Sequence, residues 1–480
     1  MNKTNIAGIT TFALVMLITG AIDSIRNLPA TALFGSSLIF FFALSAIIFL
    51  IPAALVSAEL SSHSTEKSGV FHWIHMAFGE KIAFLAIWLQ WVNTMVWFPT
   101  ILSFIAGTAT YIINPELAQN KTFLITVILS TFWILTLINL KGLHFSAKFA
   151  SFCAVIGMII PMLLIIGLAI LWVILGKPLQ ISFGMTDIFP TLSHTENWIS
   201  LTAIMTAFLG IELATVHIKE VANPQKAFPK ALFISVILIL VTMTLGSLAI
   251  AIVLPKDQIN LVSGVMQAFM NFFNNYHLYW MLPVITIMLL LGSLGGVISW
   301  VISPIKGLLH AAELGFLPPL FTQKNERGVP ANLLITQAIL VSIICLAFLL
   351  MPSVNGSYWL LTALSTQLYM LMYVIMFAAA IALKYKFVKH PQAFTIPGGK
   401  LGMWLTSLLG LCGCAITLFV GFIPPSSIDV GGFFHYRVVF CSGLVAMVLP
   451  IVFFYFYRSH SLSFPRRRES MPNGFPPARE

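Results

Sequence analysis

The stretch TGAIDSIRNLP, Thr19 to Pro29, places an aspartate, an arginine and a proline inside the first hydrophobic segment of the chain. Asp23 and Arg26 stand three residues apart, and apolar residues surround the stretch from Ile6 to Leu50. A charge at the centre of a membrane helix costs at least about 2.5–3.5 kcal/mol on insertion scales, so such charges generally have a function. The stretch therefore predicts an interrupted helix with a polar site at the break.

The composition is that of an integral membrane protein. The 480 residues are 59% hydrophobic and 8% charged, with a mean hydropathy of +0.97, whereas a soluble domain carries about 25% charged residues. The net charge of +10 does not indicate nucleic-acid binding, because the basic residues lie in short loops, where membrane topology explains them. The five cysteines fall in apolar runs without metal-site spacing, so we expect reduced packing residues and no bound metal.

Apolar segments long enough to cross a bilayer recur along the chain. A span needs about 20 mostly apolar residues, and backbone groups in lipid must be hydrogen-bonded internally, so these segments are helices. We expect about twelve, near 6–34, 36–59, 82–113, 122–140, 149–176, 197–219, 229–254, 279–310, 331–351, 358–384, 401–423 and 436–457.

The basic residues predict the orientation of these helices. With the N-terminus inside, the outer loops hold only Lys121, Lys177, Lys256 and Arg437, while the inner segments hold the rest. This asymmetry predicts a multi-pass protein with both termini in the cytoplasm. Residues 1–458 would form one transmembrane domain, and the polar, Pro- and Arg-rich tail, 459–480, is expected to be disordered.

The sixth apolar segment carries a second weak point. It reads TAFLGIELATVHIKEVANP, Thr206 to Pro224, with Gly210 and Glu212 in mid-span. Interruptions at matching places in two halves are typical of inverted-repeat transporters, whose binding site lies between the broken helices. The repeats would be 6–176 and 197–384, followed by two extra helices in 401–457.

The chemistry of two broken helices suits a zwitterionic amino acid. Free N–H groups at half-helix N-termini suit a carboxylate, and free carbonyls at C-terminal ends suit an ammonium group. The predicted substrate-binding residues in the interrupted segments are Ile22, Asp23, Ser24, Arg26, Gly210, Ile211 and Glu212.

Several motifs resemble the amino acid–polyamine–organocation (APC) superfamily, most nearly its bacterial glutamate:γ-aminobutyrate antiporters. The superfamily likeness lies in GIELATVHIKEVANPQKAFPKAL (Gly210–Leu232) and SPIKGLLHAAELGFLPPLFTQKNERGVPANL (Ser303–Leu333). The antiporter likeness lies in NLPATALFGSSLIFF (Asn27–Phe41), INLVSGVMQAF (Ile259–Phe269), LLLGSLGGVISWVISP (Leu289–Pro304), FTIPGGK (Phe394–Lys400) and FIPPSSI (Phe422–Ile428).

The resemblance implies an all-α fold of twelve transmembrane helices with a five-plus-five inverted repeat (LeuT-type) and discontinuous helices one and six. It implies alternating access in a bacterial inner membrane, a substrate held between helices one, six, eight and part of ten, and no metal or organic cofactor. Glu212 matches the family's acidic residue after the helix-six break, Phe208 an aromatic gate before it, and Trp300 a pocket aromatic on helix eight.

The chain departs from the antiporters at two site positions and in its tail. Gly296 stands where they carry a glutamate that helps select substrate, and Arg26 stands where they carry a tyrosine. Their folded C-terminal plug has no counterpart in the tail. Losing an acid and gaining an arginine shifts the expected substrate toward acidic or polar amino acids.

Each of these residues also has a structural interpretation. Arg26 either holds a substrate carboxylate, with Asp23 or Glu212 as its balance, or forms a self-neutralising ion pair with Asp23. Glu212 is either a coupling residue or a cap of the second half of helix six. Phe208 and Trp300 are either gates or core aromatics, and His217 is either part of a proton relay or a packed side chain.

The function expected from the sequence is secondary amino acid transport, with antiport preferred. The alternative is a proton-coupled symporter of broader specificity, and a sensor or a channel ranks lower. An enzyme is not expected, because no cluster of nucleophile, base and metal ligands is present. The expected partners are an amino acid substrate, a counter-substrate or proton, and membrane lipids, with no nucleic acid and with homodimerisation left open.

Overall fold

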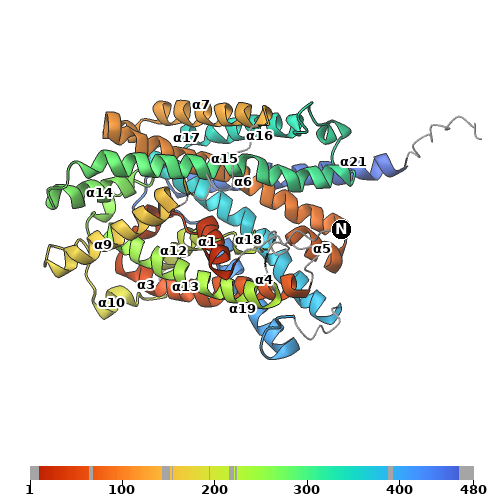
Figure 1. The fold of residues 1–480 in the computed structure, drawn as a ribbon, viewed down its shortest axis with the longest axis horizontal. Coiled ribbons are helices and arrows are strands. Elements are labelled where there is room, and N and C mark those ends of the chain that lie inside the picture. The colour runs from red at the N-terminus through yellow and green to blue at the C-terminus, as the bar shows by residue number, and fades with distance from the viewer. Residues whose placement is uncertain are drawn as a thin grey trace, which may run out of the picture.

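In a computed structural model, the described residues are 10–63, 69–142, 152–153, 155–193, 195–213, 215, 221, 224–386 and 393–463. These residues form helices and no β-strand, and most of the long helices run roughly along one direction (Figure 1). The α-helices are α1 (Thr11–Ile22), α2 (Leu28–Ala32), α3 (Leu38–Ser45), α4 (Ile51–His63), α5 (Val70–Phe78), α6 (Glu80–Ile113), α7 (Lys121–Leu140), α9 (Ile160–Ile174), α10 (Met185–Ile188), α11 (Thr195–Trp198), α12 (Ser200–Phe208), α13 (Pro224–Ala251), α14 (Gly264–Asn275), α15 (Met281–Glu313), α16 (Ala331–Cys345), α17 (Ala347–Leu350), α18 (Val354–Lys386), α19 (Gly399–Val420), α20 (Phe433–Val448) and α21 (Pro450–Ser463).

The helices match the predicted spans in number and place. Within the described residues, eleven helical segments are long and apolar enough to cross a membrane, and a shorter apolar one, Ser200–Leu213, lies where the sixth span is predicted. The prediction of an all-α membrane protein is therefore confirmed. The last helix continues to Ser463, beyond the predicted domain boundary at 458, and residues 464–480 lie outside the described part.

The first predicted span is interrupted, as its sequence indicates. Helix α1 ends at Ile22, and Asp23 and Ser24 have extended backbone. The chain then forms the 3₁₀ turn η1 (Ile25–Asn27) and the short helix α2, with Pro29 in its first turn. Proline is accepted there because the first N–H groups of a helix have no intrahelical acceptor.

The sixth predicted span is interrupted as well. Helix α12 ends at Phe208, Leu209 is extended, and Gly210 has φ +100°. A positive φ is strained for residues with a Cβ, which explains a glycine at this position. One 3₁₀ turn follows over residues 211–213, and nearly all of the predicted remainder, 214–219, lies outside the described residues.

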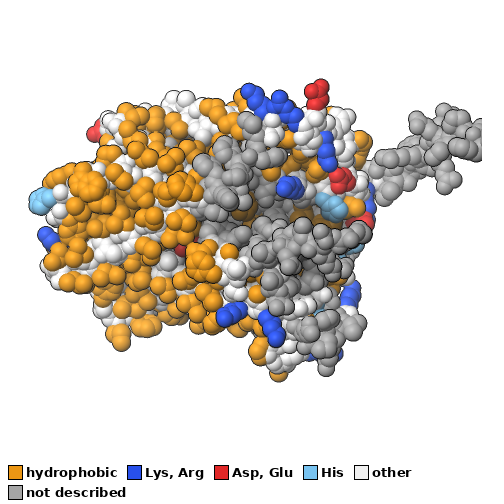
Figure 2. Space-filling model, viewed as in Figure 1, with side chains coloured by type: hydrophobic (Ala, Val, Ile, Leu, Met, Phe, Trp, Pro, Cys, Tyr) orange, Lys and Arg blue, Asp and Glu red, His pale blue; other side chains and the backbone are white. Residues whose placement is uncertain are grey.

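Long helices on both sides enclose these interruptions. Helix α1 packs against α13, α12 packs against α3 and α18, and α6 packs against both α15 and α18. In the view of Figure 2, hydrophobic side chains cover most of the visible surface, while most visible Lys and Arg side chains gather toward the end that carries α5. The apolar belt and the charged end are typical of a membrane-spanning bundle.

A contact between two glycines brings one helical turn and a long helix close together. The π-helical turn η5 (Val155–Ile159) packs on α15, and a Cβ on Gly157 would meet the Gly292 Cα at 2.1 Å. Small residues let membrane helices approach until their backbones touch, where dispersion contacts hold them together. The pair Gly157 and Gly292 therefore fixes how η5 sits on α15.

Enlarging this contact is expected to destabilise the protein. Gly292→Ala places a methyl group 2.2 Å from the Gly157 Cα, and overpacking of this kind costs about 1–3 kcal/mol. The purified variant should unfold at a lower temperature than wild type. Gly167→Ala on α9 is the matched control, because nothing lies within 4 Å of its added Cβ, and its melting temperature should be unchanged or higher. Equal melting temperatures for Gly292→Ala and wild type would contradict the contact.

Candidate functional site

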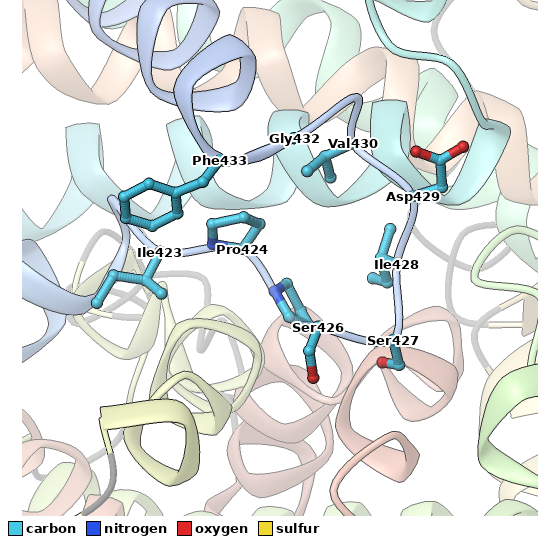
Figure 3. Close-up of a pocket in the computed structure, with 10 residues that line it drawn as sticks. Ile423, Pro424, Ser426, Ser427, Ile428, Asp429, Val430, Gly432 and Phe433 are labelled. Atoms are coloured by element: carbon cyan, nitrogen blue, oxygen red, sulfur yellow. The ribbon is translucent and has the colours of Figure 1, made fainter.

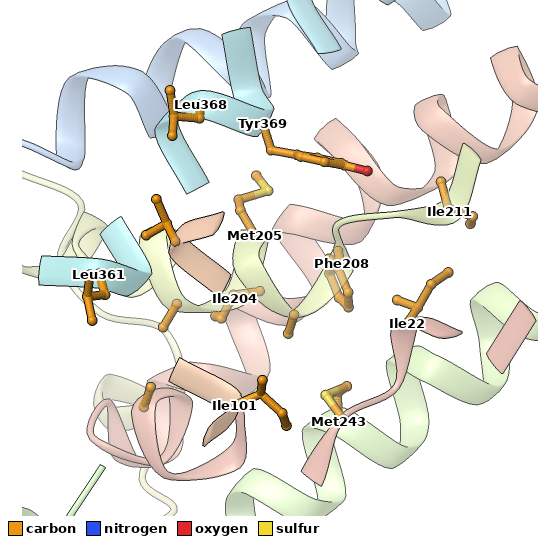
Figure 4. Packing of buried hydrophobic residues seen from close by; sticks show 14 of the residues in the cluster. Ile22, Ile101, Ile204, Met205, Phe208, Ile211, Met243, Leu361, Leu368 and Tyr369 are labelled. Carbon is orange, nitrogen blue, oxygen red and sulfur yellow. The ribbon is translucent and has the colours of Figure 1, made fainter. Parts of the chain in front are cut away.

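The two helix breaks face each other around Phe208, the last residue of α12. Figure 4 shows Phe208 with Ile22 from the end of α1, Ile211 from the turn after α12, and Met243 from α13. All four side chains are buried, and the Phe208 ring packs edge-on against Phe42, with ring centroids 5.6 Å apart. The sequence prediction that the breaks of helices one and six come together thus agrees with their positions.

Glu212 is buried just beyond the second break and is held by three donors. The Tyr369 hydroxyl donates to its Oε1 at 2.6 Å, the Gln90 amide donates to the same oxygen at 3.3 Å, and the Tyr373 hydroxyl donates to Oε2. The Tyr373 hydroxyl also accepts the Gly210 N–H at 3.1 Å. Donors on both oxygens are what a buried carboxylate needs.

This network connects the broken helix to two neighbouring elements. Gln90 lies on α6, and Tyr369 and Tyr373 lie on α18. Side chains of other helices thus satisfy the Gly210 N–H at the break and the Glu212 carboxylate beside it. Any movement of the segment after α12 must therefore exchange these hydrogen bonds for others.

Arg26 is buried and points to α6 and α18. Its Nη1 donates to Thr100 Oγ1 at 3.0 Å and to the Tyr358 hydroxyl at 3.5 Å. Its guanidinium carbon lies 5.3 Å from the centre of the Trp97 ring, a cation–π distance. Its Nε is buried without a hydrogen-bond partner. Part of the five-donor guanidinium fork is thus unused.

Asp23 points away from Arg26. Its Oδ2 accepts a hydrogen bond from Thr242 Oγ1 of α13 at 2.7 Å, while its Oδ1 is buried without a partner. Among the described residues, Arg26 pairs with no carboxylate and Asp23 with no cation. The self-neutralising ion pair, one of two sequence-based interpretations of Arg26, is therefore not formed in this structure.

Trp300 reaches the surroundings of Arg26 indirectly, because it packs on Trp97, which in turn contacts the Arg26 guanidinium. Its ring and that of Trp97 have centroids 5.9 Å apart, so Trp97 stands between Trp300 on α15 and Arg26 on η1. Near them, Gly296 has nothing within 4 Å of an added Cβ. Open space thus lies one helical turn from Trp300.

Ser24 and His217 are the remaining predicted site residues. Ser24 is extended and half-buried, and its side chain makes no capping bond to η1. His217 lies outside the described residues. Neither the relay nor the packing interpretation of His217 is tested.

A third buried acid, Glu59, lies near the end of α4, away from the breaks. Glu59 is 1% exposed, accepts the Lys384 ammonium at 2.5 Å and accepts the Ile396 N–H at 2.7 Å. Although Glu59 stands near the end of α4, where many side chains reach water, its own side chain does not. Burial of the pair ties α4 to α18 and to the loop before α19.

A surface pocket lies apart from this group of residues. The loop from α19 to α20 folds around it, and residues 423–430, 432 and 433 line it (Figure 3). None of the predicted site residues is among them.

Sequence reasoning missed the aromatic partners of the site. Trp97, Tyr358, Tyr369 and Tyr373 lie in long apolar runs, where aromatic residues usually pack in a core. One signal was available, because Tyr369 and Tyr373 stand four apart on one face of a helix, which puts two hydroxyls side by side within the membrane.

The chain matches the amino acid permease family over residues 9–447. It is 42% identical to an uncharacterized transporter of Legionella pneumophila over 92% of this chain and 95% of that protein. It is 29% identical to the glutamate/gamma-aminobutyrate antiporter of Lactococcus lactis strain IL1403, over 98% of this chain and 96% of that antiporter. It is 23% identical to the probable agmatine/putrescine antiporter of the same strain, over 77% of this chain and 78% of that antiporter.

The protein belongs to the amino acid permease family. It is a multi-pass membrane transporter and not an enzyme, and its relatives confirm the predicted likeness to the APC superfamily and to the glutamate:γ-aminobutyrate antiporters.

The Glu212 network predicts a specific cost for losing one hydroxyl. Tyr373→Phe leaves Glu212 Oε2 and the Gly210 N–H unpaired, and each buried unpaired group costs about 1–3 kcal/mol. The variant should melt well below wild type. Tyr436→Phe is the matched control, because it removes a buried hydroxyl that donates to a backbone carbonyl, that of Gly421, at 3.0 Å. A loss for Tyr373→Phe no larger than for Tyr436→Phe would count against the network.

Proposed function

We propose that this protein is an antiporter of acidic or polar amino acids that works by alternating access in a bacterial inner membrane. Its substrate would lie at the two helix breaks, against Ile22, Asp23, Ser24, Arg26, Phe208, Gly210, Ile211, Glu212 and Trp300. Both termini would lie in the cytoplasm, and residues 6–176 and 197–384 would be the inverted repeats.

The observation that carries the proposal is the direction of Arg26. Its guanidinium is buried beside a helix break, donates hydrogen bonds to two hydroxyls and lies over the ring of Trp97. It has no carboxylate partner among the described residues. A buried charge without a counter-charge is costly. A substrate carboxylate would offset that cost and would engage the guanidinium with two parallel hydrogen bonds.

The surroundings of Arg26 support a gated site. Phe208 lies at the second break and packs on Phe42, while Trp97 lies against the Arg26 guanidinium and Trp300 lies against Trp97. Glu212 would act in coupling, because its hydrogen bonds to α6 and α18 must change when the segment after α12 moves. Antiport itself rests on the named activity of relatives such as the glutamate/gamma-aminobutyrate antiporter.

Ligand-induced stabilisation tests the substrate class. A ligand that binds only the folded protein raises its melting temperature, so purified protein is screened against the standard amino acids and common amines. An acidic or side-chain-polar amino acid should give the largest rise. Arg26→Ala should weaken that ligand about 10- to 100-fold, because a hydrogen bond to a charged group contributes about 1.5–3 kcal/mol.

Arg437→Ala is the matched control. The Arg437 guanidinium carbon also lies over an aromatic ring, 3.9 Å from the centre of Phe433, but Arg437 is exposed and stands in α20, outside the predicted site. It should bind like wild type. Arg26→Lys keeps the charge and loses the fork, so it should bind weakly while folding normally. Unchanged affinity and selectivity in Arg26→Ala would overturn the assignment of Arg26 to the substrate.

Proteoliposomes separate exchange from symport. Labelled substrate should enter only vesicles that hold unlabelled amino acid inside, because an exchanger needs a counter-substrate to complete its cycle. Uptake into empty vesicles that is driven by an imposed pH gradient would instead support the proton-coupled symporter.

A further inference from the structure

A groove of about 330 Å³ lies between α4 and α13, and none of the predicted site residues lines it. Helix α4 packs on both α13 and α19, and the three helices lie along one edge of the bundle (Figure 1). Ile51 of α4 and Phe233 of α13 line the groove and are 40% and 66% exposed. The groove therefore opens on the outer surface of the bundle, where a membrane protein meets the hydrocarbon core of the bilayer.

Small side chains on one face of α4 form the floor of the groove. Ala54 and Ala58 line it and are buried. Ile51 and Leu55 line it from the same face, because their spacing from the alanines follows the three- and four-residue repeat of a helix. Each alanine side chain ends at Cβ, so the seam against α13 is left unfilled. From Ile51 to Ala58 the apolar lining extends about 10 Å along the helix.

The loop before α19 adds an aromatic side chain, Phe394, to the lining. Two residues later, the Ile396 N–H donates to Glu59 Oε2 at 2.7 Å, and Lys384 of α18 pairs with the same carboxylate. Glu59 directly follows Ala58 in α4. The buried ion pair therefore holds the loop that carries Phe394 against the end of α4.

Lys230 places a positive charge at the groove. Of the described residues that line it, Lys230 alone is charged, and its side chain is exposed. Phe233 and Val236 line the groove within the next two turns of α13, so the apolar lining extends about 9 Å from the lysine. Lys226, one turn before Lys230 on the same face, is also exposed. Among the described residues, neither lysine has a carboxylate within ion-pair distance.

An anionic phospholipid is the occupant that matches this combination. Its acyl chain is apolar and its phosphate is negative, while the groove has an apolar length with ammonium groups toward the start of α13. Basic side chains near a membrane surface attract anionic lipids, and a neutral lipid would leave these two without a partner. A second copy of the chain, bound symmetrically through this face, would bring Lys226 and Lys230 of both copies together, where like charges repel.

We propose that the groove between α4 and α13 binds an acyl chain of an anionic phospholipid, with the lipid phosphate at Lys230 and Lys226. The chain would contact α4, α13 and Phe394 at once, so it would stabilise their packing. The groove shares no residue with the proposed substrate site. The inference therefore depends neither on antiport nor on the substrate class.

Thermal unfolding of the purified full-length protein in a neutral detergent tests the site. Phosphatidylglycerol, which is anionic, and phosphatidylcholine, which carries no net charge, are titrated with identical acyl chains. A lipid that binds the folded protein raises its melting temperature. Phosphatidylglycerol should half-saturate wild type at a several-fold lower concentration than phosphatidylcholine.

Lys230→Gln tests the contact with the phosphate. It should weaken phosphatidylglycerol about fivefold, which is the contribution of one basic residue near a membrane surface, and should leave phosphatidylcholine unchanged. Lys306→Gln is the matched control, because Lys306 is also an exposed lysine on a long helix, α15, but does not line the groove. Unchanged binding of phosphatidylglycerol by Lys230→Gln, or equal binding of the two lipids by wild type, would overturn the proposal.

Phe233→Ala tests the apolar part of the groove. Phe233 is exposed, so its truncation removes lining without opening the core, and both lipids should bind several-fold more weakly. Ile237→Ala should bind both like wild type, because Ile237 is an exposed side chain one turn farther along α13 that does not line the groove. Equal lipid binding by Phe233→Ala and wild type would contradict the groove. A smaller particle mass in Phe233→Ala would show that this face joins two copies of the chain, which would also overturn the proposal.

Discussion

The Glu212 carboxylate, buried between α12 and the tyrosines of α18, is the interaction on which the arrangement of the site depends. A helix broken inside a membrane exposes backbone groups that water cannot reach. Here the Tyr373 hydroxyl accepts the Gly210 N–H and donates to Glu212, so one side chain satisfies both the broken backbone and the acid beside it. Tyr369 of α18 and Gln90 of α6 also donate hydrogen bonds to Glu212. These bonds fix the positions of α6 and α18 relative to the segment that follows α12.

The sequence was sufficient for the positions of the helices and of their interruptions. Hydrophobic length gives the spans, and Asp23 with Pro29 and Gly210 with Glu212 mark places where an unbroken helix would be unfavourable. The direction of each charge could not be predicted. Asp23 and Arg26 are one helical turn apart only if the segment is wound, and the extended backbone at Asp23 and Ser24 turns the two side chains to different helices.

The side chains that contact the buried charges could not be predicted from the sequence for a different reason. Trp97 and Tyr358 look like core residues in their own helices, and only packing of η1 between α6 and α18 gives them Arg26 as a neighbour. Glu59 shows the same limit. Its place near a helix end indicates access to water, but Lys384, more than 300 positions later in the chain, folds over it. Contacts between distant segments are set by tertiary packing, which spacing along one helix does not encode.

The central claim is that the broken first helix separates two opposite charges, leaving Arg26 to an anionic substrate group. The most direct measurement is an experimental structure with the amino acid that stabilises the protein most. The account predicts a ligand carboxylate within hydrogen-bond distance of the Arg26 guanidinium, at the break next to Phe208. An Arg26 paired with Asp23, or a ligand bound without contact to Arg26, would contradict it.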